Sequence, residues 1–425
     1  MQADLWTFVF AAALVASQSV KLWLAGRQIR HVAVNRTVVP AAFSAVMPLL
    51  AHQKAADYTI TRTRFGLLTS AFGAAVVLGW TLLGGLDALN ATVHDAVAPR
   101  LGELAYQVAL VGAFALIGGA LELPFDAYAT FRIEQRFGFN RVTPKLFVID
   151  LLKGLLVALL LGGPLVALVL WIMGSTGGLW WLWAWIVWVA FQVLMLVLYP
   201  TVIAPLFNTF QPLADEAVRQ RVTALMQRCG FAAKGLFVMD GSRRSAHGNA
   251  YFTGLGAAKR VVFFDTLLAR LQPTEVEAVL AHELGHYKLR HIAKRVAVMF
   301  GISLAGFALL GWLAGRSWFY SGLGVQPNIA APNDALALLL FVMVVPVFGF
   351  FAAPVLALQS RRHEFEADAY ACVQASGDDL AAALLKLHED NASTLTPDPV
   401  YVRFYYSHPP ATERLAALRA RPAGA

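Results

Sequence analysis

Seven apolar runs, most of about twenty residues, constrain the fold of this chain more than any other feature of its sequence. A helix of that length crosses the ~30 Å hydrocarbon core of a bilayer, because an α-helix rises ~1.5 Å per residue. The runs are Leu5–Leu24, Phe65–Leu86, Leu104–Leu123, Leu146–Met173, Leu179–Ile203, Val296–Ala314 and Ala335–Leu358. The sequence therefore predicts an α-helical integral membrane protein with seven transmembrane helices.

The composition agrees with this class and excludes others. Hydrophobic residues make up 58% of the 425 residues and charged residues only 14%, which is too apolar for a soluble protein of this length. The net charge of +8 is carried between the apolar runs and forms no basic stripe interleaved with aromatics, so no nucleic-acid binding is expected. Cys229 and Cys372 are the only cysteines, which excludes a disulfide framework and a cysteine-held metal.

Positive charge predicts the orientation of the chain in the membrane, because cytoplasmic connections carry an excess of Lys and Arg. The basic residues follow the first run (Arg27, Arg30, Arg36, Lys54, Arg62, Arg64) and the third run (Arg132, Arg136, Arg141, Lys145). We therefore expect the N-terminus outside and the C-terminus inside. The chain divides into helices 1 to 5 at 1–203, a cytoplasmic insert at 204–295, helices 6 and 7 at 296–358, and a cytoplasmic tail at 359–425. The insert and the tail can then meet on one side of the membrane.

The insert contains an H-E-x-x-H motif, His282 to His286, in a segment that reads as helix. Histidines at i and i+4 lie on one helical face, so their imidazoles can bind the same cation. Glu283 is rotated by about 100° from His282, which suits a general base acting on water activated by the metal. Thr274 as N-cap and Glu277 as its capping-box partner predict that the helix begins near Glu275.

A catalytic zinc site needs a third protein ligand. His291 is a poor candidate, because it lies nine residues after His282 where the extended motif needs ten, and we expect it to be a polar residue at the membrane interface. A downstream segment supplies Glu364 as the expected ligand and Asp368, one turn later on the same face, as the carboxylate that orients a ligating histidine. Glu366 points to the far side. The alternative interpretation of this segment is a charged helix face leaving the membrane.

The remainder of the insert predicts a small α+β unit ahead of the metal helix. Asp215–Arg228 has the pattern of an amphipathic helix. Short apolar segments bounded by glycine predict strands at Leu236–Met239, Ala250–Thr253 and Arg260–Phe264.

Six segments, in consistent order along most of the chain, resemble the type I CAAX prenyl endopeptidases, which are integral membrane zinc metalloproteases of the a-factor-converting type. They are F-R-I-E-Q-R-F-G-F-N at Phe131–Asn140, A-P-L-F-N at Ala204–Asn208, H-G-N-A-Y-F at His247–Phe252, H-E-L-G-H at His282–His286, S-R-R-H-E-F-E-A-D-A-Y-A at Ser360–Ala371 and Y-S-H-P-P-A-T-E-R-L at Tyr406–Leu415. The resemblance implies a ring of seven helices around a large intramembrane chamber, with the protease site at its cytoplasmic end.

The resemblance also implies roles for individual residues. The zinc ligands fall on His282, His286 and Glu364 and the catalytic base on Glu283, in agreement with the helical geometry. Three further positions follow from the resemblance. Asn249 falls on an edge strand that aligns the substrate, His408 on a catalytic histidine that stabilises the oxyanion, and Arg414 on an arginine supporting the site beside Asp368. The alternatives are a turn residue for Asn249 and a solvated charge for Arg414.

The expected activity is peptide-bond hydrolysis with one Zn²⁺ per chain, by resemblance the removal of the C-terminal tripeptide of prenylated CAAX-type substrates. A composition rich in Ala and Leu favours a bacterial inner membrane, where prenylated substrates are uncommon. A broader membrane-protein quality-control protease without a prenyl requirement is therefore the alternative. A transporter or scaffold with an incidental H-E-x-x-H is the remote alternative. The sequence leaves the oligomeric state open.

Overall fold

The computed structural model describes residues 2–44, 46–232, 235–253, 260–329 and 331–420. Among these residues, seven helical segments are long and apolar enough to cross a membrane, which confirms the predicted number. They are Ala3–Val34, Leu49–Trp80, Glu103–Phe137, Pro144–Ser175, Gly177–Phe207, His291–Ala314 and Asp334–Gln374. Two cavities beside the predicted site are lined by residues of these helices, among them Tyr58 of the second segment and Val298 of the sixth.

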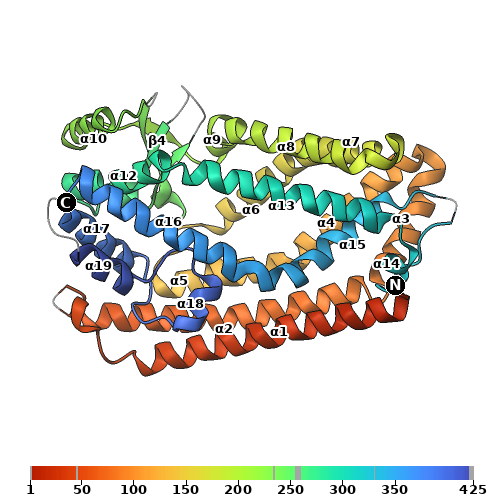
Figure 1. Ribbon diagram of the computed structural model, residues 1–425, viewed down its shortest axis with the longest axis horizontal. Coiled ribbons are helices and arrows are strands. Elements are labelled where there is room, and N and C mark those ends of the chain that lie inside the picture. The colour runs from red at the N-terminus through yellow and green to blue at the C-terminus, as the bar shows by residue number, and fades with distance from the viewer. Residues whose placement is uncertain (1, 45, 233–234, 254–259, 330, 421–425) are drawn as a thin grey trace.

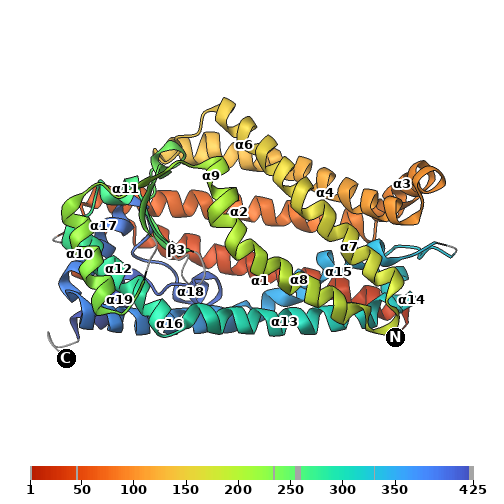
Figure 2. The same ribbon diagram turned by 90° about the horizontal axis from the view of Figure 1, so that it is seen from above.

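The individual elements of this part subdivide the seven segments and add three shorter helices, η1, α3 and α14. They are α1 (Ala3–Val34), η1 (Ala41–Phe43), α2 (Leu49–Trp80), α3 (Gly85–Leu101), α4 (Glu103–Tyr128), η2 (Ala129–Glu134), α5 (Gln135–Phe137), α6 (Pro144–Val157), η3 (Ala158–Gly162), α7 (Gly163–Ser175), η4 (Gly177–Leu179), α8 (Trp180–Leu198), η5 (Tyr199–Ile203), α9 (Ala204–Phe207), α13 (His291–Ala314), α14 (Ser317–Ser321), α15 (Asp334–Gly349), η8 (Phe350–Ala352) and α16 (Ala353–Gln374). The long helices run along the longest axis of the molecule, with the N-terminus near α14 at one end (Figures 1 and 2). The other end holds α10 (Glu216–Arg228), α12 (Pro273–Lys288), α17 (Gly377–Asp390) and α19 (Ala411–Arg419).

The second predicted run was misplaced, and so were the basic residues before it. Helix α2 begins at Leu49 and ends at Trp80, so Arg62 and Arg64 lie on the helix rather than in a connection. Arg27 likewise lies on α1. Hydropathy locates only the apolar part of a helix, and both helices continue for several turns beyond it.

The insert forms the expected α+β unit. Its elements are β1 (Phe210–Pro212), α10 (Glu216–Arg228), β2 (Gly235–Met239), η6 (Gly241–Arg243), β3 (Ala250–Thr253), β4 (Arg260–Phe264), α11 (Asp265–Leu268) and α12 (Pro273–Lys288). The predicted amphipathic helix and the three predicted strands are confirmed. Strand β1, which the sequence analysis missed, has three residues and ends in a proline.

The four strands form one sheet in the order β1-β2-β4-β3. Strands β2 and β4 are parallel, and the two outer strands pair antiparallel with their neighbours. Among the residues that the structure describes, β3 pairs only with β4, where Tyr251 lies opposite Val262, so β3 lies at an edge of this sheet. This free edge faces the predicted metal helix.

The tail helices α17 (Gly377–Asp390), α18 (Pro399–Tyr405) and α19 (Ala411–Arg419) complete the fold. One hydrophobic core contains buried residues of both the insert and the tail, among them Val222, Phe263, Val276, Leu380 and Leu415. Burying these side chains stabilises the contact between the two segments. The expectation that insert and tail meet is therefore confirmed.

Candidate active site

Helix α12 positions the H-E-x-x-H motif, but it begins two residues earlier than predicted. Gln272 is the N-cap, Pro273 occupies the first helical position, and the Glu275 carboxylate accepts a hydrogen bond of 2.7 Å from the Gln272 backbone N–H. Proline suits this position because it has no N–H to satisfy and its φ is already helical. Thr274 and Glu277, the predicted capping pair, instead contact neighbouring helices: Thr274 bonds Asp379, and Glu277 pairs with arginines of α10.

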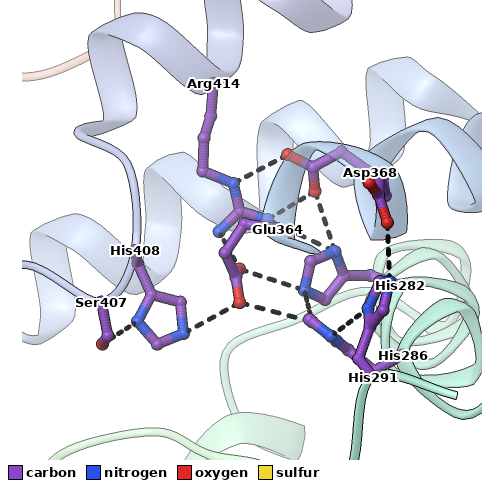
Figure 3. A network of polar contacts seen from close by, with 9 residues as sticks. His282, His286, His291, Glu364, Asp368, Ser407, His408 and Arg414 are labelled. Carbon is purple, nitrogen blue, oxygen red and sulfur yellow. Dashed lines mark hydrogen bonds and ion pairs between the residues drawn. The ribbon is translucent and has the colours of Figure 1, made fainter. Parts of the chain in front are cut away.

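Gly285 allows α12 to lie directly against α16. A Cβ atom at this position would lie 3.0 Å from the Ala367 Cα and 3.2 Å from the Tyr370 Cβ. The absence of a side chain therefore brings the two backbones together. This close approach places Glu364 of α16 opposite the two histidines of α12, as Figure 3 shows.

The donor atoms of His282, His286 and Glu364 converge on one point. The two Nε2 atoms are 3.2 Å apart, and oxygens of Glu364 lie 3.5 Å from His282 Nε2 and 3.3 Å from His286 Nε2. Tetrahedral zinc with bonds of about 2.0–2.1 Å separates its ligand atoms by roughly 3.3–3.4 Å, so the donor set fits this ion. The buried Oε2 of Glu364 also lacks a hydrogen-bond partner among the described residues.

Asp368 and Arg414 contact the Nδ1 side of the His282 ring, opposite the Nε2 atom of the donor set. Asp368 Oδ1 lies 2.8 Å from His282 Nδ1, and Arg414 donates from Nε to Asp368 Oδ2 at 2.8 Å. Burial disfavours the protonated imidazole, but the contacts with Asp368 and Glu364 outweigh it and raise the pKa of His282 to about 9. The surrounding carboxylates thus favour positive charge at this point. Arg414 is 5% exposed, so the alternative of a solvated charge is wrong.

His291 has a role that the sequence analysis missed. It is 3% exposed, and its Nδ1 lies 3.1 Å from Nδ1 of His286. Its Nε2 lies 2.8 Å from the Glu366 carboxylate. When Nε2 of His286 faces a metal, the ring proton resides on Nδ1, and His291 can accept that proton's hydrogen bond while donating to Glu366. The chain of contacts orients His286 from behind.

His291, His363 and Glu366 also form a second group of potential metal ligands. The rings of His291 and His363 are stacked 4.0 Å apart at an interplanar angle of 7°. Parallel stacked imidazoles direct their lone pairs along parallel planes rather than at one point. The hydrogen-bonding interpretation of His291 therefore fits this geometry better than a second ion.

His408 lies on the loop between α18 and α19 and faces the donor set from the side opposite α12. Its Nε2 is 3.4 Å from Glu364 Oε1, and its Nδ1 is 2.9 Å from the Ser407 hydroxyl. The His408 side chain is 66% exposed, and partial desolvation together with the charge of Arg414 lowers its pKa, which favours the neutral ring. If the Ser407 hydroxyl donates to Nδ1, the proton of the neutral ring is on Nε2, directed into the site. Ser407 was not singled out in the sequence, because a lone serine carries no pattern.

Two cavities meet at Glu283, which takes no part in the donor set. Both are lined by His282, Glu283 and His408. The cavity of about 660 Å³ also includes Asn249, and the cavity of about 400 Å³ also includes Phe252. Burial raises the pKa of Glu283, so this carboxylate binds a proton more readily than one in water. Asn249 is exposed at the start of β3, where its side chain accepts a hydrogen bond from the Ala250 N–H.

Comparisons with known proteins agree along the whole chain. The family model described as "CAAX prenyl protease N-terminal, five membrane helices" matches residues 28–209, and the one described as "Peptidase family M48" matches residues 212–422. The CAAX prenyl protease 1 homolog of Oryza sativa is 34% identical, covering 92% of each chain. CAAX prenyl protease 1 of Saccharomyces cerevisiae is 30% identical and covers 97% of this chain and 95% of the relative. The crystal structure of S. mikatae Ste24p superimposes with a TM-score of 0.89 at 29% identity, covering 97% of this chain and 99% of that one.

Proposed function

The chain belongs to peptidase family M48, among the CAAX prenyl proteases, and from this premise we propose that it is a zinc endopeptidase that removes the C-terminal tripeptide of prenylated proteins. It is a metalloendopeptidase with membrane-spanning helices. The metal ligands, the base and the substrate are the proposed parts.

The convergence of three donors carries the proposal. His282, His286 and Glu364 come from two helices that are about 80 residues apart in the sequence, yet their ligand atoms lie within 4.8 Å of one another. A zinc ion held there supplies Lewis acidity, which polarises a peptide carbonyl and lowers the pKa of a water toward about 7. We assign one ion per chain to these three ligands.

The protein's own groups perform the proton transfers. Glu283 lines both cavities beside the donor set, where it takes a proton from the attacking water and later gives it to the leaving amine. His408, with its proton on Nε2, donates a hydrogen bond to the developing oxyanion. Asp368 fixes the tautomer of His282, and Arg414 holds Asp368.

The edge strand β3 aligns the substrate. A peptide bound in extended form adds a strand to a free sheet edge and gains main-chain hydrogen bonds. Asn249 marks the start of this edge and lines the 660 Å³ cavity. The smaller cavity continues past Phe252 along apolar side chains of α13 and α16, namely Ile292, Val298, Met299 and Leu356, which suits a prenyl chain.

We assign the site to the cytoplasmic side of a bacterial inner membrane, with the N-terminus outside. Basic residues gather in the C-terminal half of α1, in the N-terminal half of α2 and around α5, and this cluster supports the orientation.

The test is hydrolysis of a peptide pair by the purified protein. One peptide carries a farnesylated cysteine in a CAAX sequence and the other is identical but unprenylated, with Glu283→Gln as the blank. We expect zinc-dependent cleavage of the farnesylated peptide only. Equal cleavage of both peptides would identify a broader membrane protease, and no cleavage of either would overturn the proposed function.

A further inference from the structure

The 660 Å³ cavity beside the metal site contains a cation to which the proposed mechanism gives no role. The cavity extends from His282 and Glu283 to Arg62 of α2. An arginine on a helix of membrane-spanning length is costly to keep near the bilayer unless it faces a bundle interior or a watery cavity. Arg62 lines this cavity and also a neighbouring cavity of about 430 Å³, and its side chain is 60% exposed.

The Arg62 guanidinium is held by hydrogen bonds along one edge, and its other edge is available to a ligand. Its Nη1 donates to the Tyr58 hydroxyl and to Glu134 Oε1, each at 3.0 Å. Its Cζ lies 5.7 Å from the centre of the Tyr58 ring. Among the described residues, Nε and Nη2 of Arg62 have no hydrogen-bond partner. These two nitrogens form the fork that binds a carboxylate through two parallel hydrogen bonds.

Arg414 is the other arginine that lines this cavity. Its Nε and Nη2 are engaged by Asp368, its Nη1 lies 3.6 Å from Glu364, and its side chain is 6% exposed. His388 also lines the cavity, but burial lowers its pKa, which favours the neutral ring. Arg62 is therefore the cation that this cavity can offer to an incoming anion.

The direction of a bound peptide brings its C-terminus toward Arg62. Antiparallel pairing, the more stable arrangement, directs a peptide on β3 from Thr253 toward Asn249. Residues before the scissile bond then lie along Phe252 and the apolar side of the smaller cavity. Residues after the scissile bond lie past Asn249 in the larger cavity, which contains the basic group. The smaller cavity thus combines apolar side chains for a lipid with one arginine, Arg295, and the larger cavity offers Arg62 on the side where the leaving peptide ends.

Side-chain contacts connect the start of β3 to Arg62. His247, two residues before Asn249, has Nε2 3.9 Å from Glu134 Oε2, and the other oxygen of Glu134 contacts Arg62. The path from Asn249 to the guanidinium thus runs back along the chain to His247 and then through the contacts of His247 with Glu134 and of Glu134 with Arg62.

We propose that Arg62 binds the C-terminal carboxylate of the substrate and so sets the cut three residues from the end of the chain. This inference rests on the proposed function and names the group that measures the length of the leaving peptide. Tyr58 and Glu134 position the guanidinium, and its Nε and Nη2 donate to the two carboxylate oxygens.

The experiment compares two farnesylated CAAX peptides that differ only at the C-terminus, a free acid and its amide. For the wild type we expect kcat/KM for the acid to exceed that for the amide by about tenfold or more, as a bidentate charged contact allows. In Arg62→Gln this ratio should fall to near one, and Arg62→Lys should restore part of it. Arg64→Gln is the matched control, since Arg64 lies two residues away on the same helix and lines a different cavity.

Two outcomes overturn the inference alone. One is a wild type that cleaves acid and amide equally, and the other is an Arg62→Gln variant that keeps the wild-type preference. Both leave the proposed function intact, because the farnesylated peptides are still cleaved. A zinc-loaded wild type that cleaves neither peptide overturns the proposed function and the inference together.

Discussion

Glu283 lies beside the three metal-binding donors but is not one of them, so its role as a base can be tested separately from metal binding. Glu283→Gln keeps the size of the side chain and leaves the three donors untouched, but it removes the proton acceptor. We expect zinc content equal to that of the wild type and a loss of kcat of about 10²- to 10⁴-fold. Metal analysis and peptide hydrolysis on the same sample check this. A variant that retains full activity would show that another group acts as the base.

His291 acts through His286 rather than on a substrate. His291→Phe keeps the stacking on His363 but removes the contact with His286 Nδ1. Loss of such an orienting contact weakens metal binding by about 10- to 100-fold. Competition with a chelator measures the affinity. His363→Phe is the matched control, because it alters the same stacked pair without touching a ligand, and equal affinities in both variants would contradict the assignment.

The site residues that could be predicted from the sequence are those whose spacing has a geometric meaning. An i, i+4 pair lies on one helical face, so the grouping of His282 with His286, and that of Glu364 with Asp368, could be predicted. The contact of His291 with His286 was not predicted because it crosses a turn between two helices, where Arg290 takes a left-handed φ of 57°. A contact made by such a reversal leaves no periodic signal.

At the scale of elements, the contact between α12 and α16 sets the site geometry. Gly285→Ala inserts a methyl group 3.0 Å from Ala367 Cα and 3.1 Å from its carbonyl oxygen. We expect a loss of about 1–3 kcal/mol of stability, as for other overpacked contacts, and weaker zinc binding. Thermal unfolding and zinc titration measure both. Gly301→Ala on α13 meets nothing within 4 Å and should leave both unchanged. A Gly285→Ala variant with wild-type values would show that the helices do not depend on this approach.

Asp398 fastens the tail to the first membrane helix. It is 2% exposed, accepts hydrogen bonds from Arg27 at 2.9 and 3.2 Å, and caps α18 through the Val400 and Tyr401 N–H groups. Charged hydrogen bonds of this kind contribute about 1.5–3 kcal/mol each, so Asp398→Asn should destabilise the fold at neutral pH.

The same carboxylate predicts a pH dependence. Burial acts to raise the pKa of Asp398, but the hydrogen bonds from Arg27 and the backbone outweigh it and lower the pKa below its ordinary value. A lowered native pKa contributes stability above the unfolded pKa of about 3.9, and that stability is lost as the pH falls through the native value. Denaturation curves should therefore show a difference between wild type and Asp398→Asn that shrinks below about pH 4. A difference that grows on acidification would contradict this.

The elements themselves were predictable where periodicity is strong. Apolar length gave the number of membrane helices, and alternation with glycine boundaries gave β2, β3 and β4. The start of α2 and the cap of α12 were misplaced for physical reasons. Hydropathy does not detect the polar turns of a long helix. Proline is favoured at the first helical position, so Pro273 begins α12 instead of preceding its N-cap.

At the scale of the whole molecule, the long helices form one body and the insert and tail cover one end of it (Figure 1). Hydropathy predicts the number of spans but contains no information about lateral neighbours, so their arrangement came from the family resemblance. The shared core of insert and tail explains why the metal ligands are split between two distant segments. The site forms only when both segments fold against each other.

The most direct test of the account is to remove the metal from the purified protein with a chelator and then add zinc back stepwise. We predict that hydrolysis of the farnesylated peptide disappears and returns in full at one zinc per chain, and that Glu364→Ala, which removes one of the three donors, does not recover under the same conditions. Undiminished hydrolysis by the metal-free protein, or full recovery of Glu364→Ala at one zinc per chain, would contradict the assignment of catalysis to His282, His286 and Glu364.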